Sequence, residues 1–488
     1  MARINTNVSA LIAQRNLART NQDLGVRLER LSTGLRINRG ADDPAGLITS
    51  ERLRSELGGI AQAISNSERA SSVIATAEGA LSEVSEMLSS IRGLIVGASN
   101  TGGVSPEELQ ANQLQIDSAI DSITRISNTT SFAGLQLLNG SLDYLTSGID
   151  TTDIARSRIY GAFFGDNDSI PVDVQVISSA TTAALTMTAS YGGTGDGTLL
   201  SSLTLEVAGK EGVQVIQFVS GQSVSAVVAA VNLLKDSTGV SASLVSPSDL
   251  SSGIVFNSTA YGTDSFVSVS RIGQSGTFFD AQMSGNRDAG TDVVAVVNGV
   301  LATGEGLDVS VKTPTLNVEL TLDEGFATQT VNTSRFYITG GGATFQLGPN
   351  VKTNQQINFA IGSVAASRLG GSLVNGELQY LSSLKSGGTN ALASGNYVDA
   401  SKVIEQAIDD ISVLRGQLGA IERNTLETNS RSLQVAMENI TASNSKIRDA
   451  DFAAETSALS RAQVLTQTGT SVLAIANSST QNVLQLLG

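Results

Sequence analysis

The sequence predicts a mostly α-helical protein with a β-rich insertion, in which long coiled-coil helices from both termini form a rod beside a central α+β domain. Two observations support this fold class. All twenty aromatic residues lie at or after Phe132, and nineteen of them fall between Phe132 and Tyr397. The two ends have the Ala, Leu, Ser, Gln and Glu content of long helices, whereas the middle is rich in Gly, Thr, Ser and Val, as sheets and turns are.

The N-terminal arm, residues 1–39, is basic and helical in pattern. Seven arginines stand against Asp23 and Glu29, a net charge of +5. A leucine stripe at helical spacing comprises Leu17, Leu24, Leu28, Leu31 and Leu35. The arm could be an amphipathic surface helix or a basic helix that pairs with the C-terminal one. A helix lying on a membrane is less favoured, because the arm has no Trp or Phe anchor.

Two further helices are expected before residue 130. Asp43 suits an N-cap with Pro44 in the first helical position, and Ser105-Pro106-Glu107-Glu108 restarts a helix with a capping box. Apolar residues at steps of three and four then predict a coiled-coil seam that recurs near the other end of the chain. This rod seam comprises Ile74, Leu81, Val84, Leu88, Ile91, Ile95, Ile404, Ile411, Leu414, Leu418 and Ile421.

The last 27 residues, Ala462–Gly488, contain no charged side chain. Apolar residues again share one face, at Leu465, Val472, Ala476, Val483 and Leu487. The stretch is too interrupted to span a membrane. We therefore interpret it as an assembly helix buried among other protein helices; the alternative is a terminal helix docked on its own domain. No Pro follows Pro349, which predicts an uninterrupted C-terminal helix.

The middle of the chain, roughly 145–370, has strand-like patterns. Residues 203–245 predict a β-β-α-β unit in which Ser223 caps the helix and Gly239 ends it. Gly340-Gly341-Gly342 lacks the Lys-Ser/Thr of a phosphate loop, so we expect a hairpin turn there. Asp409 and Asp410 are expected to be solvated charges without organised partners.

Composition excludes several functional classes. The chain has no His, Cys or Trp and a formal net charge of −15. The absence of His and Cys excludes Ser-His-Asp and Cys-His nucleophile systems and most zinc sites. The acidic net charge makes the chain a poor binder of nucleic acids. We expect no enzyme, cofactor or metal, no transmembrane segment and no cleaved signal peptide.

The chain resembles bacterial flagellin, the filament subunit of the flagellum. The N-terminal matches are residues 3–7, 31–38 and 41–46, and the C-terminal matches are residues 447–453 and 476–484. Residues 197–245 resemble an insertion motif of some flagellins and hook-type proteins. The resemblance implies an inner terminal coiled-coil layer (1–42 and 452–488), a helical rod with a β-hairpin (43–170 and 345–451) and a surface-exposed outer domain (171–344).

The resemblance also implies a function and partners. The expected function is a structural subunit that polymerises into the extracellular filament for motility, through terminal helices that fold on polymerisation. Expected partners are further copies of the chain, an export chaperone on the C-terminal helix, and the filament cap and hook-junction proteins. Type III export without a signal peptide and glycans on the outer domain are expected as well. The alternatives are a hook–filament junction protein, a coiled-coil adhesin and an enzyme hosted in the middle domain.

In many flagellins an innate immune receptor binds the helix that corresponds to Met87–Asn100. Its motif places two Arg around an apolar residue and continues with Glu-Leu. Arg92 and Leu94 match this motif. The sequence departs from it at Ser90, at Gly93 and, on the following helix, at Gln115, which stands where an acidic contact is expected. The resemblance therefore predicts weak activation of the receptor.

Overall fold

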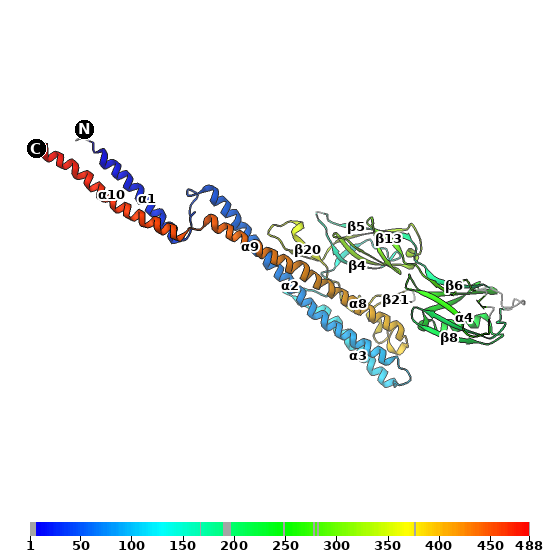
Figure 1. Ribbon diagram of the computed structural model, residues 1–488. Coiled ribbons are helices and arrows are strands. Elements are labelled where there is room, and N and C mark those ends of the chain that lie inside the picture. The colour runs from blue at the N-terminus through cyan, green and yellow to red at the C-terminus, as the bar shows by residue number, and fades with distance from the viewer. Residues whose placement is uncertain are drawn as a thin grey trace. The chain divides into compact units, whose positions relative to one another are not determined.

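The computed structural model describes residues 6–165, 167–188, 197–246, 249–276, 279–280, 283–374 and 377–487, with only the backbone described for 249–251 and 479–487. The chain forms two compact units. The terminal unit comprises Met1–Arg69, Gln346–Gln355 and Arg423–Gly488, and the central unit comprises Ala70–Phe345 and Gln356–Glu422. Figure 1 shows the elements, coloured along the chain from blue at the N-terminus to red at the C-terminus.

The terminal unit is helical. It contains α1 (Val8–Thr33), the first part of α2 (Pro44–Ala98), α9 (Glu427–Arg448), α10 (Phe452–Leu487) and the short helix η1 (Thr353–Gln355). Helices α1 and α10 lie side by side and antiparallel (Figure 1), since the Asn7 side chain donates to the Ala476 carbonyl and Arg27 reaches Glu455. As predicted, Pro44 begins α2, and the Asp43 carboxylate caps it by accepting from the Gly46 N–H at 2.9 Å.

The prediction of an uninterrupted C-terminal helix was wrong. A π-helical turn, Glu422–Leu426, precedes α9, and α9 ends at Arg448. Asp449 is extended (ψ 147°) and forms an antiparallel bridge with Leu35. Backbone hydrogen bonds join Arg36 N–H to the Arg448 carbonyl and Ala450 N–H to the Gly34 carbonyl. The chain leaves the helix because these bonds to the distant segment 34–36 replace helical ones, and no local sequence signal reveals that competition.

The helices of the central unit are the rest of α2, α3 (Pro106–Thr129) and α8 (Tyr397–Ile421). The Ser105 side chain accepts from Glu108 N–H, so the predicted N-cap of α3 is confirmed. Side-chain contacts run along α2 and α8 in antiparallel order, from Ser71–Glu422 (2.5 Å) through Glu78–Arg415 (3.7 Å) to Arg92–Glu405 (3.2 Å). The short helices η2 (Leu381–Leu384) and η3 (Leu392–Ser394) contact α3.

A first β lobe is a sandwich of two antiparallel sheets. One has the strand order β14-β13-β5-β18-β3 and the other β15-β16-β17-β4. Alternate residues of both sheets point into one core that includes Val174, Phe336 and Leu320. Its elements are β3 (Tyr144–Ser147), β4 (Ile154–Ala162), β5 (Ile170–Ser178), β13 (Val294–Val297), β14 (Val300–Leu301), β15 (Thr303–Glu305), β16 (Asp308–Lys312), β17 (Leu316–Leu322), α7 (Glu324–Ala327) and β18 (Thr333–Gly341).

A second β lobe is inserted between β5 and β13 and has its own core, centred on Leu205, Val231 and Phe256. The predicted β-β-α-β unit is present as β7, β8, α4 and β9, with the Ser223 cap and a left-handed Gly239. The described elements of this lobe are β6 (Thr182–Thr188), β7 (Leu203–Gly209), β8 (Val213–Phe218), α4 (Val224–Leu233), α5 (Lys235–Thr238), β9 (Val240–Ser246), β10 (Asp249–Tyr261), β11 (Phe266–Arg271) and β12 (Arg287–Ala289).

The expected hairpin turn at Gly340–Gly342 was wrong. Strand β18 pairs with β3 and β5, and the next strand, β19 (Ala343–Gln346), pairs with β20 (Gln356–Phe359) in another sheet. Glycine is required because all three residues have positive φ, and a Cβ on Gly341 would lie 2.2 Å from the Asp143 carbonyl oxygen. The remaining two-stranded sheets are β1–β2 (Ser131–Phe132, Leu135–Gln136) and β21–β22 (Ser372–Val374, Glu377–Gln379).

Candidate assembly surfaces

The contact between α1 and α10 follows a heptad pattern on both helices. Among the buried and half-buried residues of the two helices, thirteen recur at steps of three and four, the spacing of a coiled-coil seam. On α1 they are Ala13, Leu17, Thr20, Leu24, Arg27 and Leu31, and on α10 they are Glu455, Leu459, Ala462, Thr466, Gly469, Leu473 and Ala476. We call these thirteen residues the terminal seam. Four of the predicted core positions, Leu17, Leu24, Leu31 and Ala476, lie in it.

Other predicted core positions lie outside the terminal seam. Leu28, Leu465 and Val472 are about half exposed, at 51%, 52% and 47%. On α10, Leu465 and Val472 share an apolar face with Val464 and Ile475 that the chain itself leaves uncovered, and we call these four residues the open face. Further large apolar side chains that stay exposed are Val8, Leu11, Ile12 and Leu28 of α1 and Phe452 of α10. The side chains of Val483 and Leu487 lie outside the described residues, although α10 extends through both positions.

Sequence reasoning missed the small and polar members of the terminal seam. Ala462, Gly469 and Ala476 recur every seven residues, as do Leu459, Thr466 and Leu473. That repeat could have identified the face, but an apolar search favours the larger side chains of the open face. Gly469 is close-packed, since a Cβ there would lie 3.8 Å from the Leu17 Cβ.

A charged cluster interrupts the terminal seam. Glu455 accepts from Arg27 at 2.9 and 3.1 Å and from Arg30 at 3.1 Å, and its side chain is only 10% exposed. Burial by itself would raise the pKa of Glu455, but the two arginines outweigh it and hold the pKa below its usual value. Glu455 is the single acidic residue of the 36-residue helix α10.

The predicted rod seam lies almost wholly inside the central unit's core. Ile74, Leu81, Val84, Leu88, Ile91, Ile95, Ile404, Ile411 and Leu418 are buried, whereas Leu414 and Ile421 are half-buried. The polar contacts between α2 and α8 show that their faces approach each other. At the positions of the expected receptor motif, Arg92 is exposed and paired with Glu405, and Leu94 is half-buried. Ser90 and Gly93 on α2 and Gln115 on α3 are exposed.

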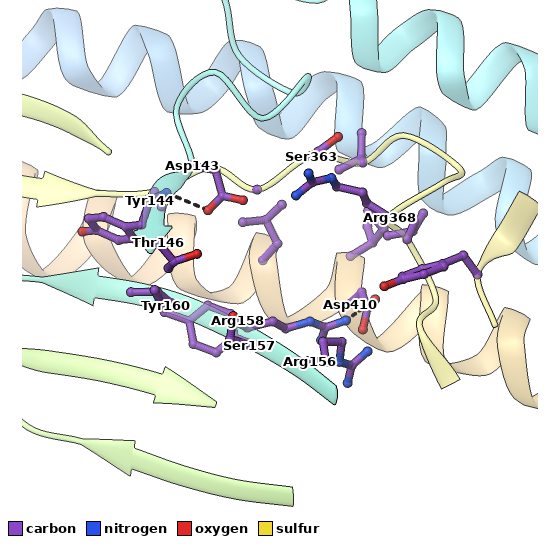
Figure 2. A pocket seen from close by; sticks show the side chains of 18 of the residues that line it. Asp143, Tyr144, Thr146, Arg156, Ser157, Arg158, Tyr160, Ser363, Arg368 and Asp410 are labelled. Atoms are coloured by element: carbon purple, nitrogen blue, oxygen red, sulfur yellow. Dashed lines mark hydrogen bonds and ion pairs between the residues drawn. The ribbon is translucent and has the colours of Figure 1, made fainter. Parts of the chain in front are cut away.

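A polar cavity of about 490 Å³ lies where β4, the segment 360–369 and α8 meet (Figure 2). Arg156, Arg158 and Tyr160 line it from alternate positions of β4, and Asp410 faces Arg158 from α8. Asp410 pairs with Arg158 and also accepts from Gly370 N–H at 3.0 Å and from the Gln406 amide at 2.9 Å. The expectation that Asp410 is a solvated charge was therefore wrong, and only Asp409 is exposed.

Burial shifts the pKa of several groups at this cavity. It raises the pKa of Asp143 and brings that of Tyr160 to about 12, with the neighbouring Glu319 acting in the same direction. Burial also lowers the pKa of Arg156, and the nearby positive charge of Arg158 lowers it further. Tyr160 donates to Glu319 at 2.8 Å and Arg156 donates to the Gly371 carbonyl, while the pair of Arg158 with Asp410 joins the sheet to α8. In the described part of the chain, no group of three or more Asp or Glu residues is placed to hold a metal ion.

Three family models match the chain. Residues 4–143 match "Bacterial flagellin N-terminal helical region", residues 401–487 match "Bacterial flagellin C-terminal helical region", and residues 202–260 match "Flagellin hook IN motif". The last match confirms the predicted insertion motif. Along the described helices, no segment is both long and apolar enough to cross a membrane.

Whole-chain relatives agree with these matches. The chain is 30% identical to B-type flagellin of Pseudomonas aeruginosa and 30% identical to flagellin of Escherichia coli, with 99% of each chain covered in both cases. It is 28% identical to flagellin of Salmonella choleraesuis at the same coverage.

Solved structures are more distant. The flagellar hook associated protein-3 of Legionella pneumophila has a TM-score of 0.31 at 12% identity, covering 81% of this chain and 98% of that one. The Escherichia coli flagellar cap protein has a TM-score of 0.29 at 18% identity, covering 48% and 64%. At these scores the superpositions carry no argument. The family models and the whole-chain relatives show that this chain belongs to the bacterial flagellin family and is a structural subunit of flagellar filaments.

Proposed function

We propose that the subunit polymerises through its terminal helices, and that these helices fold stably only when neighbouring copies cover them. The observation that carries this proposal is the open face. In the described parts of α1 and α10, nine large apolar side chains stay exposed after the two helices have paired, four of them on the open face. A monomer normally covers such a surface with charged residues. Helix α10 instead has only Glu455 and Arg461 as charged residues.

The energetics favour coupled folding and assembly. Isolated helices are marginal in water, and most of their stability in proteins comes from burying an apolar face. Six of the thirteen residues of the terminal seam are Ala, Thr or Gly and two are charged, so five leucines supply most of the apolar area that the seam buries. Covering the open face in a neighbour would supply the missing burial. Neutral side chains such as Gln467 and Asn477 can enter such an interface without burying an unpaired charge.

The layered arrangement stays part of the proposal. Residues 1–42 and 452–488 would form the inner layer, 43–170 and 345–451 the rod, and 171–344 the exposed outer domain. Strands β3 and β4, before residue 170, pair with β18 and β17 on the other side of the proposed boundary. The outer domain would carry any glycans, and changes to its sequence would leave filament formation intact.

The same proposal extends to delivery and partners. Terminal helices that are marginal alone, in a chain without Cys, suit export of an unfolded polypeptide through the type III apparatus without a cleaved signal peptide. An export chaperone would cover the C-terminal helix, and the cap and hook-junction proteins would meet the subunit at the filament ends.

Removal of Ala462–Gly488 tests the proposal. The truncated chain should retain the folded central unit, measured by circular dichroism and thermal melting, but should not form filaments in a sedimentation and electron-microscopy assay. Val472→Asp should weaken assembly in the same way, because it places an unpaired charge in a packed layer. The matched control is Val472→Thr, a neutral side chain of similar size at the same position. Normal filaments from the truncated chain would refute the proposal.

A further inference from the structure

We propose that the Glu455–Arg27–Arg30 cluster determines the register in which α1 pairs with α10. This inference rests on the proposed assembly through the terminal helices and names the residues that give it specificity.

The apolar part of the terminal seam does not distinguish one register from the next. Leu17, Leu24 and Leu31 are seven residues apart on α1. On α10 the small residues at 462, 469 and 476 and the larger ones at 459, 466 and 473 repeat with the same period. A slip of seven residues therefore places leucine where leucine was and a small residue where a small residue was. The free energy of hydrophobic burial depends on the apolar area that is buried and not on which residues supply it. The slipped pairing therefore loses little of this stabilisation.

The charged cluster breaks this degeneracy. Glu455 accepts three hydrogen bonds from Arg27 and Arg30, and the exposed fractions of the three side chains are 10%, 26% and 20%. A slip of seven residues in one direction places Arg27 beside Ala462, leaving its charge and that of Glu455 unpaired in the seam. A slip in the other direction moves Arg27 and Arg30 past Phe452, where α10 begins, so both arginines lose Glu455. A single polar pair in an otherwise apolar seam is a known means of specifying helix register.

Other contacts of this helix pair carry less sequence information. The bridge between Leu35 and Asp449 uses backbone groups, which any residue except proline could supply. The contact at the far end, from the Asn7 amide to the Ala476 carbonyl, is a neutral hydrogen bond to a backbone group. The cluster, by contrast, requires charged side chains of opposite sign at particular positions of the two helices.

Cysteine cross-linking in the otherwise Cys-free full-length chain tests the proposal. A Cβ on Gly469 would lie 3.8 Å from the Leu17 Cβ, the usual separation in a disulfide. Leu17→Cys/Gly469→Cys therefore reports the native register. Leu24→Cys/Gly469→Cys and Leu17→Cys/Ala462→Cys report slips of seven residues in the two directions. Cross-links are formed in assembled filaments and scored on non-reducing gels. Co-assembly of single-cysteine chains identifies links between subunits.

In the native background, only the first pair should cross-link efficiently. Glu455→Gln should lower the ratio of native to slipped cross-links at least about tenfold, because a charged hydrogen-bonding group has lost its partner. The reversed cluster, Glu455→Arg/Arg27→Glu/Arg30→Glu, should recover most of the native ratio. Arg461→Gln, which removes the exposed charge of the same helix, is the matched control and should change nothing.

The outcomes separate this inference from the proposed function. Filament formation is measured independently by sedimentation. Filaments in which Glu455→Gln leaves the cross-linking ratio unchanged would overturn the register inference but leave the assembly proposal intact. Failure of the reversed cluster to recover the native ratio would overturn it too. Loss of all filament formation on shortening α10 bears only on the assembly proposal.

Discussion

Replacing Asp410 by Asn should destabilise the central unit, whereas the same change at the adjacent Asp409 should not. The Asp410 side chain is 7% exposed and pairs with Arg158, which is 20% exposed. Asn retains an acceptor for the Gly370 N–H, so the substitution mainly removes the charge opposite Arg158. The two residues carry equal charge and are consecutive in α8, which makes Asp409→Asn a matched control.

The magnitude follows from the burial of this ion pair. Removing one partner of a buried ion pair typically costs about 3–5 kcal/mol. Because Arg158 keeps a fifth of its exposure and lines an open cavity, we expect the lower limit, about 3 kcal/mol. For a cooperative unit of this size, each kcal/mol lowers Tm by about 2 °C, so the expected shift is ~6 °C. Asp409→Asn, a surface change, should stay within about 0.5 kcal/mol.

Calorimetry of the monomeric protein measures the shift, and amide exchange at β4 and residues 369–371 measures its location. The double variant Arg158→Gln/Asp410→Asn should regain much of the loss, because no unpaired charge is left. Equal Tm values for the two single variants would refute the reasoning. So would a double variant less stable than Asp410→Asn alone.

Three further predictions concern the two units. Deleting residues 182–290, which joins Thr181 to its bridge partner Thr291, should preserve folding and filament formation, because the second β lobe has its own core; loss of assembly would show that this lobe carries essential contacts. Receptor activation by depolymerised protein should be weak and should rise about thirtyfold in Ser90→Arg/Gly93→Glu/Gln115→Glu, since one Arg anchor contributes about 2 kcal/mol; full activity of the unchanged monomer in a reporter assay would contradict this. The terminal helix pair should loosen in acid. The folded pKa of Glu455 is lowered, so its contribution is present above the ordinary glutamate pKa and is lost as pH falls through the folded value; Glu455→Gln should flatten that part of the stability–pH curve.

The local sequence determined where the helices α2, α3 and α4 begin. Asp43-Pro44, Ser105-Pro106 and Ser223 act as caps because the relevant interactions span only three residues. The rod seam was predictable for the same reason, since one helical period places Ile74 to Ile95 on a single face whatever packs against it. The family and its function followed from motifs at the two ends.

Tertiary structure alone decided which face of α10 pairs within the chain, where its preceding helix stops and which acid is buried. Leu465 and Val472 resemble core residues in sequence, yet α1 covers the smaller residues at 462 and 469, because close helix approach favours small side chains over large ones. Asp409 and Asp410 are the same residue type in the same helix. Only the position of Arg158, more than 250 residues earlier, distinguishes them, and a local pattern contains no information about a partner so far along the chain.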